Sequence, residues 1–174
     1  CVDLFNQNTI QNILPFDGEA IYKGVIFSRK ESEAHYKNLF EEIPWENDQA
    51  IVFGKHYITK RKVAWFGDKP YSYKYSGITK QAHIWTPELL QLKQKIEEIS
   101  TTSYNSCLLN LYHTGDEGMA WHSDAEKTLL DNGTIASVTL GAERKFSFKH
   151  KESKQRIDVL LENGSLLLMK GTTQ

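Results

Sequence analysis

Two side chains that commonly bind metal ions lie two positions apart in the stretch YHTGDEGMAWHSDAEK, residues 112–127. They belong to His122 and Asp124. In an extended segment, residues two apart share a face, so the imidazole and the carboxylate could bind the same ion. A His-x-Asp triplet also fits a histidine that is hydrogen-bonded to a nearby carboxylate. The spacing therefore predicts a candidate metal site, with the hydrogen-bonded pair as the alternative.

Fe(II) suits such a pair, because non-haem Fe(II) oxygenases hold iron by two histidines and one carboxylate on one face of the ion. That arrangement leaves three coordination positions for a cosubstrate and oxygen. No second histidine is evident on a strand that a jelly roll would bring back to His122. The remaining histidines are His35, His56, His83, His113 and His150. Residues 112–127 therefore predict two of the three protein ligands.

The segment CLLNLY, residues 107–112, places an amide and a phenol two positions apart. In a strand, Asn110 and Tyr112 would point to one face and the flanking leucines to the other. The two polar groups would then share a pocket wall one strand before the candidate metal pair. The same alternation also fits an ordinary strand with a polar outer face.

Two helices are predicted ahead of these strands. Ser28 followed by Glu31 resembles a capping box, and the helix that it opens should end near Pro44. Its apolar positions are Leu39, Phe40 and Ile43. The second helix should open at Thr86 and Pro87, with threonine as N-cap and proline at the first helical position. Its apolar stripe, which we expect to face the core, consists of Leu89, Leu92, Ile96 and Ile99.

Strands dominate the second half of the chain. EAIYKGVIF, residues 19–27, already has strand composition, and from Tyr104 onward the hydrophobic period changes to two. Turn residues there separate five short segments: SCLLNLY, TIASVTL, KFSFKH, RIDVLLE and SLLLMK. Such a series favours an antiparallel sandwich or jelly roll. The predicted class is α+β, with a double-stranded β-helix (jelly-roll) core and N-terminal helices packed on one side.

The chain of 174 residues has a formal net charge of −1, which argues against binding nucleic acid by bulk charge alone. Two segments nevertheless carry a local excess of positive charge. Residues 55–62, KHYITKRK, carry four Lys or Arg side chains and no acid, and residues 144–156, RKFSFKHKESKQR, carry six against Glu152. Basic residues interleaved with aromatics fit a groove that tracks phosphates, or a solvated strand face.

Neither a membrane span nor a disulfide framework is predicted. The longest apolar run, residues 166–169, is far shorter than the roughly 20 residues that a spanning helix needs, and no charged-then-apolar leader opens the chain. Of the two cysteines, Cys1 and Cys107, the second lies in an apolar run and is expected to be a buried free thiol. We expect a soluble monomer with no membrane partner, in the cytoplasm if bacterial and in the nucleus if eukaryotic.

Four motifs, taken in order and spacing, resemble the AlkB-type Fe(II)/2-oxoglutarate-dependent dioxygenases, which remove alkyl groups from nucleic-acid bases. They are NLY, WHSD, ASVTLGAERKFSFKHK and ENGSLLLMKGTTQ. The upstream stretch VFGKHYITKRKVAWFGDKPYSYKYSG resembles the branch that acts on double-stranded DNA. The resemblance covers residues 51–174. It implies a single dioxygenase domain over residues 1–174, with a nucleotide-recognition region near residues 50–80.

The resemblance also implies a reaction and its residues. The reaction is oxidative demethylation of 1-methyladenine- or 3-methylcytosine-type bases in DNA, by base flipping and with release of formaldehyde. Fe(II) would be held by His122 and Asp124, and the cosubstrate 2-oxoglutarate by Asn110 and Tyr112. Phe53 matches an aromatic finger that fills the gap left by a flipped base. The implied contacts with alkylated, double-stranded DNA are Phe53, Gly54, Lys55, Tyr73, Lys74, Tyr75 and Glu126.

Two departures from the family pattern qualify this resemblance. Ala125 stands where relatives often carry Asp or Lys. The family's second histidine and its two 2-oxoglutarate-binding arginines follow the match to MKGTTQ and lie beyond Gln174, so we expect a domain that is incomplete at its C-terminus. Two alternatives stay open. One is a dioxygenase of the same fold that acts on RNA or protein, against which the VFGK finger argues; the other is a catalytically silent nucleic-acid-binding domain.

Overall fold

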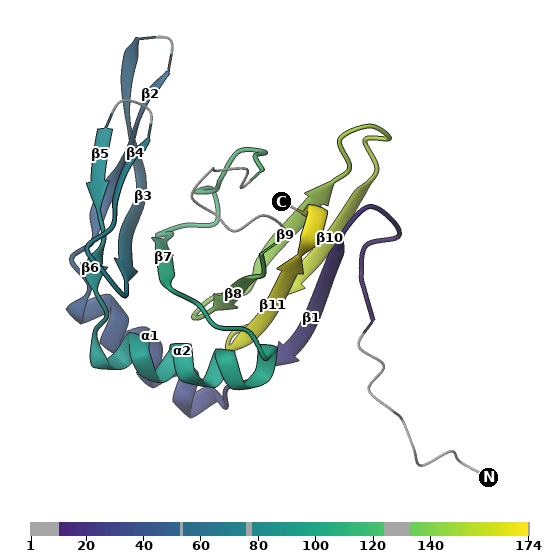
Figure 1. Cartoon of the computed structure of the whole chain (residues 1–174), viewed down its shortest axis with the longest axis horizontal. Coiled ribbons are helices and arrows are strands. Elements are labelled where there is room, and N and C mark those ends of the chain that lie inside the picture. The colour runs from purple at the N-terminus through teal and green to yellow at the C-terminus, as the bar shows by residue number, and fades with distance from the viewer. Residues whose placement is uncertain (1–10, 53, 76–77, 124–132, 174) are drawn as a thin grey trace. The chain divides into compact units, whose positions relative to one another are not determined.

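The structure is a computed structural model of the chain, and it describes residues 11–52, 54–75, 78–123 and 133–173. The chain divides into two compact units. The terminal unit comprises Cys1–Tyr36 and Ser123–Gln174, and the central unit comprises Lys37–His122. Figure 1 shows the helices and strands of both units.

Helix α1 (Arg29–Glu42) begins where the capping box was predicted. The backbone N–H of Ser28 donates to Glu31 Oε2 at 2.7 Å, and the backbone N–H of Glu31 donates to Ser28 Oγ at 3.3 Å. The helix ends two residues before Pro44, because the residue before a proline is pushed out of the helical region. Of the three predicted apolar positions, Leu39 and Ile43 are buried, whereas Phe40 is half exposed.

Helix α2 (Pro87–Ser100) has the predicted N-cap, since Thr86 Oγ1 accepts the backbone N–H of Leu89 at 3.2 Å. Its predicted stripe is buried at Leu89 and Leu92 and half-buried at Ile96 and Ile99. Neither α1 nor α2, the two α-helices among the described residues, is long and apolar enough to cross a membrane.

The terminal unit contains an antiparallel sheet of order β1–β11–β8 and the hairpin β9–β10, which Figure 1 shows beside the sheet. Its strands are β1 (Glu19–Val25), β8 (Ile135–Thr139), β9 (Arg144–Lys149), β10 (Arg156–Leu161) and β11 (Ser165–Lys170), followed by the 3-10 turn η1 (Gly171–Thr173). The strands predicted after residue 130 and the strand predicted at residues 19–27 are therefore confirmed within two residues at each end.

The core of the terminal unit forms where the hairpin covers the sheet. Leu167 of β11 packs with Ala20 of β1 and Leu161 of β10, and all three are buried. Partly buried side chains from both layers and from the segment before β1 complete the cluster: Ile13, Leu14, Tyr22, Phe146, Phe148, Val159 and Met169. Strand β10 alternates between exposed and more buried residues, whereas the first four residues of β11 are all buried, so both faces of β11 are covered.

The central unit is built around β3, which pairs antiparallel with β2 through its first half and with β7 through its second half. Two residues at the end of β3 also pair in parallel with β6, and β4 and β5 form a separate hairpin. The bounds are β2 (Glu46–Val52), β3 (Lys55–Gly67), β4 (Ser72–Tyr75), β5 (Ile78–Gln81), β6 (His83–Ile84) and β7 (Ser106–Leu111).

A bulge interrupts the pairing of β2 with β3. Asn47 pairs with Lys62 and Gln49 pairs with Ile58, so three residues of β3 lie opposite Asp48. These three residues are Thr59, Lys60 and Arg61. The irregular segment is held by hydrogen bonds, including one of 2.8 Å from Asn47 Nδ2 to the carbonyl of Thr59. Bulges of this kind can redirect side chains, and both Asp48 and Arg61 lie within this one.

Strands β2, β4, β5 and β6 were not predicted from the sequence, and β3 was predicted only in part and as one of two interpretations. The run KHYITKRK, for which a solvated strand face was one of two interpretations, forms the first half of β3, and residues 55–58 are exposed. Exposure on both faces and the bulge remove the alternation that would have marked this segment as a strand.

Strand β7 carries Cys107, a free cysteine that pairs across the sheet with Phe66. Burial raises the pKa of its thiol to about 11, although the residue as a whole keeps partial exposure. The predicted buried thiol is therefore confirmed, and at neutral pH it stays protonated.

Gly164 should be the glycine of the terminal unit that is hardest to replace. It has a φ of +78°, and an added Cβ would lie 2.3 Å from Ser32 Oγ and 3.0 Å from the carbonyl oxygen of Phe27. We expect Gly164→Ala to lower the free energy of unfolding by about 2–4 kcal/mol, from backbone strain plus steric overlap. Gly24→Ala is the matched control, because its φ is +71° but no atom lies within 4 Å of the added Cβ. Urea unfolding measures both, and equal losses would contradict the steric explanation.

Candidate active site

Strand β7 presents Asn110 at the surface of the central unit. Asn110 pairs with Val63 and Leu109 pairs with Ala64 on β3. Leu109 is buried and Asn110 is exposed, so the predicted alternation in CLLNLY is found. Tyr112, the second predicted 2-oxoglutarate residue, follows the last residue of the strand and is half-buried.

Asn110 is bound by a charged residue that the sequence analysis did not single out. Arg61 is only 7% exposed, and its guanidinium donates through Nη1 to Asn110 Oδ1 and through Nη2 to Asp48 Oδ2. Lys80, on β5, donates to the other oxygen of the Asp48 carboxylate. In the sequence, Arg61 is one of four Lys or Arg residues in the run 55–62, and the sequence analysis assigned one role to the whole run. The pairing of β3 with β7 distinguishes Arg61 from the neighbouring lysines, because it brings Arg61 next to Asn110.

His122 has the hydrogen bond that metal-binding histidines usually have. Its Nδ1 lies 2.8 Å from the carbonyl oxygen of Ala120. A carbonyl can only accept, so Nδ1 must carry the hydrogen, and the lone pair of the neutral ring belongs to Nε2. Such a bond from the other ring nitrogen fixes the tautomer and orientation of a ligating imidazole. His122 is also exposed, so its described environment fits an Fe(II) ligand.

The other predicted ligand, Asp124, and the predicted substrate contact Glu126 lie outside the described residues, as does Ala125. Within the described ranges, no group of three or more His, Cys, Asp or Glu side chains could hold a metal ion. The expectation that His122 and Asp124 supply two ligands and that a third lies beyond Gln174 therefore stays a prediction.

The remaining predicted DNA contacts lie on two hairpins of the central unit. Gly54, with a φ of +75°, and the exposed Lys55 lie where β3 begins, whereas Phe53 is outside the described residues. Tyr73, Lys74 and Tyr75 lie in β4, where they pair with Lys80, Thr79 and Ile78 of β5. The pairing places Tyr73 directly opposite the lysine that binds Asp48.

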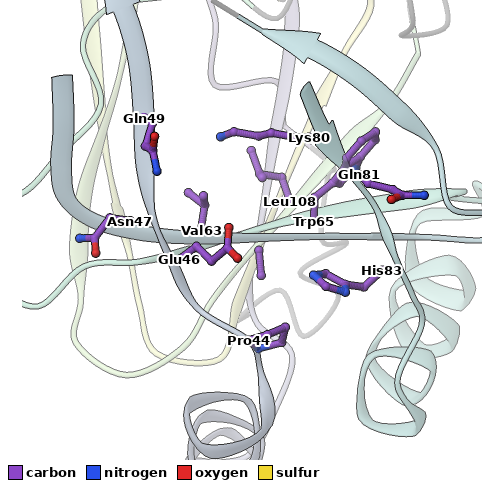
Figure 2. Close-up of a pocket in the computed structure, with 11 residues that line it drawn as sticks. Pro44, Glu46, Asn47, Gln49, Val63, Trp65, Lys80, Gln81, His83 and Leu108 are labelled. Atoms are coloured by element: carbon purple, nitrogen blue, oxygen red, sulfur yellow. The ribbon is translucent and has the colours of Figure 1, made fainter. Parts of the chain in front are cut away.

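A pocket of about 280 Å³ opens on the central unit. Strands β2, β3 and β7 and residues 80–83 contribute to its wall, and Figure 2 shows Lys80 extending from one side toward Gln49 on β2. The lining combines apolar and hydrogen-bonding side chains: Pro44, Glu46, Asn47, Gln49, Val63, Ala64, Trp65, Lys80, Gln81, His83 and Leu108. The wall therefore offers both apolar contact and hydrogen-bonding groups.

In the loop between β7 and His122, the carboxylate of Glu117 contacts both the backbone and the side chain of His113. Glu117 Oε2 accepts the backbone N–H of His113 at 3.0 Å and lies 3.2 Å from His113 Nδ1. The pKa of Glu117 is lowered, chiefly by the backbone hydrogen bond and further by the side chain of His113 and the charge of Lys60. The ionised form of Glu117 therefore stabilises this loop.

Glu117→Gln should destabilise the folded protein in a pH-dependent manner. A carboxyl whose pKa is lowered by folding contributes stability above its unfolded pKa and loses it as the pH falls through the lower folded value. We expect the variant to be less stable than the wild type at pH 7 and the difference to shrink as the pH falls below 4.5, the ordinary pKa of glutamate. Urea unfolding at a series of pH values measures this, and a difference that is constant with pH would contradict the role of the charge.

Comparison with known proteins gives consistent matches. A family model described as the 2OG-Fe(II) oxygenase superfamily matches residues 18–174. The chain is 35% identical over 154 residues to "Alpha-ketoglutarate-dependent dioxygenase alkB homolog 3" of Bos taurus, which covers 83% of this chain and 54% of the relative. It is 31% identical over 160 residues to "DNA oxidative demethylase ALKBH2" of Mus musculus, which covers 86% of this chain and 67% of the relative. The chain thus spans about half the length of the first of these relatives.

These matches confirm the resemblance to AlkB-type dioxygenases, together with the α+β jelly-roll class and the cofactors Fe(II) and 2-oxoglutarate that are typical of the family. The resemblance to the branch that acts on double-stranded DNA stays a prediction. The chain belongs to the 2OG-Fe(II) oxygenase superfamily and is homologous to AlkB-type dioxygenases.

Proposed function

We propose that the protein is an Fe(II)/2-oxoglutarate-dependent dioxygenase that removes alkyl groups from N-alkylated bases in DNA, with release of formaldehyde. The observation that carries this proposal is the hydrogen bond from His122 Nδ1 to the carbonyl of Ala120, in a chain of this oxygenase family. It assigns the lone pair of the neutral ring to Nε2, the atom that would ligate the metal. Relatives that carry the name DNA oxidative demethylase support DNA as the substrate.

In this proposal His122 and Asp124 hold the metal, and Asn110 and Tyr112 hold the cosubstrate. When bound, Fe(II) and 2-oxoglutarate supply an oxygen-dependent oxidation of the alkyl carbon, with succinate and CO2 as coproducts. The residues of the chain bind and orient these groups. The Asn110 amide is presented from a strand whose register is fixed by β3, so it can donate to the cosubstrate without rearrangement.

The DNA would be bound by the two basic segments and by the hairpins of the central unit. A base in a duplex has to leave the stack before its alkyl group can be oxidised, and unstacking costs a few kcal/mol, least for a damaged base. Phe53, between β2 and β3, would offset part of that cost by filling the gap, and Tyr73 and Tyr75 would contact the flipped base. Exposed cations of the β9–β10 hairpin could contact phosphates: Lys145, Lys149, Lys151, Lys154 and Arg156.

His122→Ala in the full-length protein should abolish succinate release from 2-oxoglutarate while it leaves the melting temperature unchanged, because His122 is exposed. His35→Ala is the control, since His35 lies in α1 and packs edge-on against Phe27. Succinate and formaldehyde are measured with methylated duplex DNA, methylated single-stranded DNA and methylated RNA. Wild-type turnover by His122→Ala would disprove the metal site. If only methylated RNA is demethylated, the substrate is RNA and the proposal of DNA as the substrate is wrong.

Phe53→Ala should lower demethylation of duplex DNA about tenfold or more and change demethylation of single-stranded DNA much less, because a wedge has a gap to fill only in a duplex. Tyr57→Ala is the matched control, since Tyr57 is an exposed aromatic residue on the same β2–β3 hairpin. Initial rates on both substrates measure the ratio. Equal losses on both substrates, or a large drop in melting temperature, would identify Phe53 as a packing residue.

A further inference from the structure

The amide of Asn110 has a defined orientation because of the residue that binds it. A guanidinium has only donors, so the Asn110 atom that faces Arg61 must be the oxygen. The Asn110 Nδ2 group is then the part of the amide left to meet a ligand, and it can only donate. Such a group suits an acceptor, and a carboxylate oxygen is the strongest one that a small organic acid offers.

Arg61 is itself held in place by several features. Its neighbours Thr59 and Lys60 complete the bulge opposite Asp48, and Thr59 Oγ1 donates to the carbonyl of Arg61 at 2.9 Å. The side chains of Arg61 and Asp48 are 8% and 13% exposed. A planar guanidinium can donate to Asp48 and to Asn110 from two different nitrogens at once, which an ammonium cannot reproduce with the same geometry.

Among the residues that the structure describes, positive charge exceeds negative charge in this cluster. Two cations, Arg61 and Lys80, share the one carboxylate of Asp48. The excess of positive charge lies beside Asn110 and favours an anion at the exposed face of the amide. Burying an ion pair costs desolvation energy and is weak evidence for a purely stabilising role. The arrangement is better explained by the orientation that it imposes on Asn110.

We propose that Arg61, held by Asp48, is a positioning residue that orients the Asn110 amide so that its NH2 group faces the carboxylate of the cosubstrate. Lys80 extends the same network to the β4–β5 hairpin. This inference rests on the proposed function, because it assigns 2-oxoglutarate to Asn110. It gives Arg61 an individual role that differs from the phosphate contact expected of the basic run 55–62.

The inference is tested by 2-oxoglutarate binding to the full-length protein, measured by calorimetry with Mn(II) in place of Fe(II) and without DNA. Arg61→Lys keeps the charge but cannot donate to Asp48 and Asn110 with the same geometry. We therefore expect roughly ten- to hundredfold weaker binding of 2-oxoglutarate, which corresponds to the loss of one hydrogen bond to a charged group. Asp48→Asn should weaken binding in the same direction. In turnover, both variants should raise the KM for 2-oxoglutarate far more than they lower kcat.

Asn110→Asp separates positioning from stability. A carboxylate at this position still accepts from Arg61, so the melting temperature should be kept or raised, whereas 2-oxoglutarate binding should fall at least tenfold because the donor is lost and two carboxylates repel. Asp68→Asn is the control. Asp68 also forms an ion pair with a lysine of the central unit, and its Oδ1 lies 3.2 Å from Lys93 Nζ. Removal of the Asp68 charge should leave 2-oxoglutarate binding unchanged.

The outcomes distinguish this inference from the proposed function. If the wild type does not bind 2-oxoglutarate, both are overturned. If the wild type binds it and Arg61→Lys binds equally well, the positioning role alone is overturned. Should Arg61→Lys fail to fold, Asp48→Asn and Asn110→Asp decide the question, and wild-type affinity in both would overturn the inference.

Discussion

Backbone pairing along both edges of β3 is the interaction on which the central unit depends. The strand hydrogen-bonds to β2 in its first half and to β7 in its second half, and its last two residues also pair with β6. Because successive side chains of a strand point to opposite faces, a shift of one residue in the β3–β7 register would exchange Asn110 and Leu109 between surface and interior. Backbone hydrogen bonds thus decide the face of β7 on which Asn110 lies, and the side chain of Arg61 then orients its amide.

The two units are stabilised in different ways. The terminal unit packs aliphatic side chains of β1, β10 and β11, and Leu166, Leu167 and Leu168 are at most 1% exposed. The central unit also buries apolar residues, but it places Arg61 and Asp48 at low exposure beside them. Apolar packing tolerates exchange among residues of similar volume, whereas a charged pair demands one geometry. We therefore expect the terminal unit to accept more substitutions than the neighbourhood of Arg61.

Features that depend on neighbouring residues could be predicted from the sequence, whereas contacts between residues far apart in the chain could not. The capping box at Ser28 and Glu31, the N-cap at Thr86 and the strands after Tyr104 are local patterns, and all were predicted. Among the strands of residues 46–84, only part of β3 was predicted, because exposure and a bulge obscure their period. The contact of Arg61 with Asn110 joins residues 49 positions apart, so no local pattern could indicate it. His122 was singled out by its spacing to Asp124 and by the resemblance of WHSD to the family motif, and its role as a metal ligand stays a prediction.

The buried thiol of Cys107 has a consequence for the redox behaviour of β7. Thiolates, not thiols, react with peroxides and exchange with disulfides, and a pKa of about 11 leaves almost no thiolate at neutral pH. Cys107 is three residues from Asn110 on the same strand, yet oxidants that modify accessible cysteines should leave this strand intact. The Cys107 thiol should therefore react slowly with reagents that require a thiolate, and the strand that carries Asn110 should keep its structure in their presence.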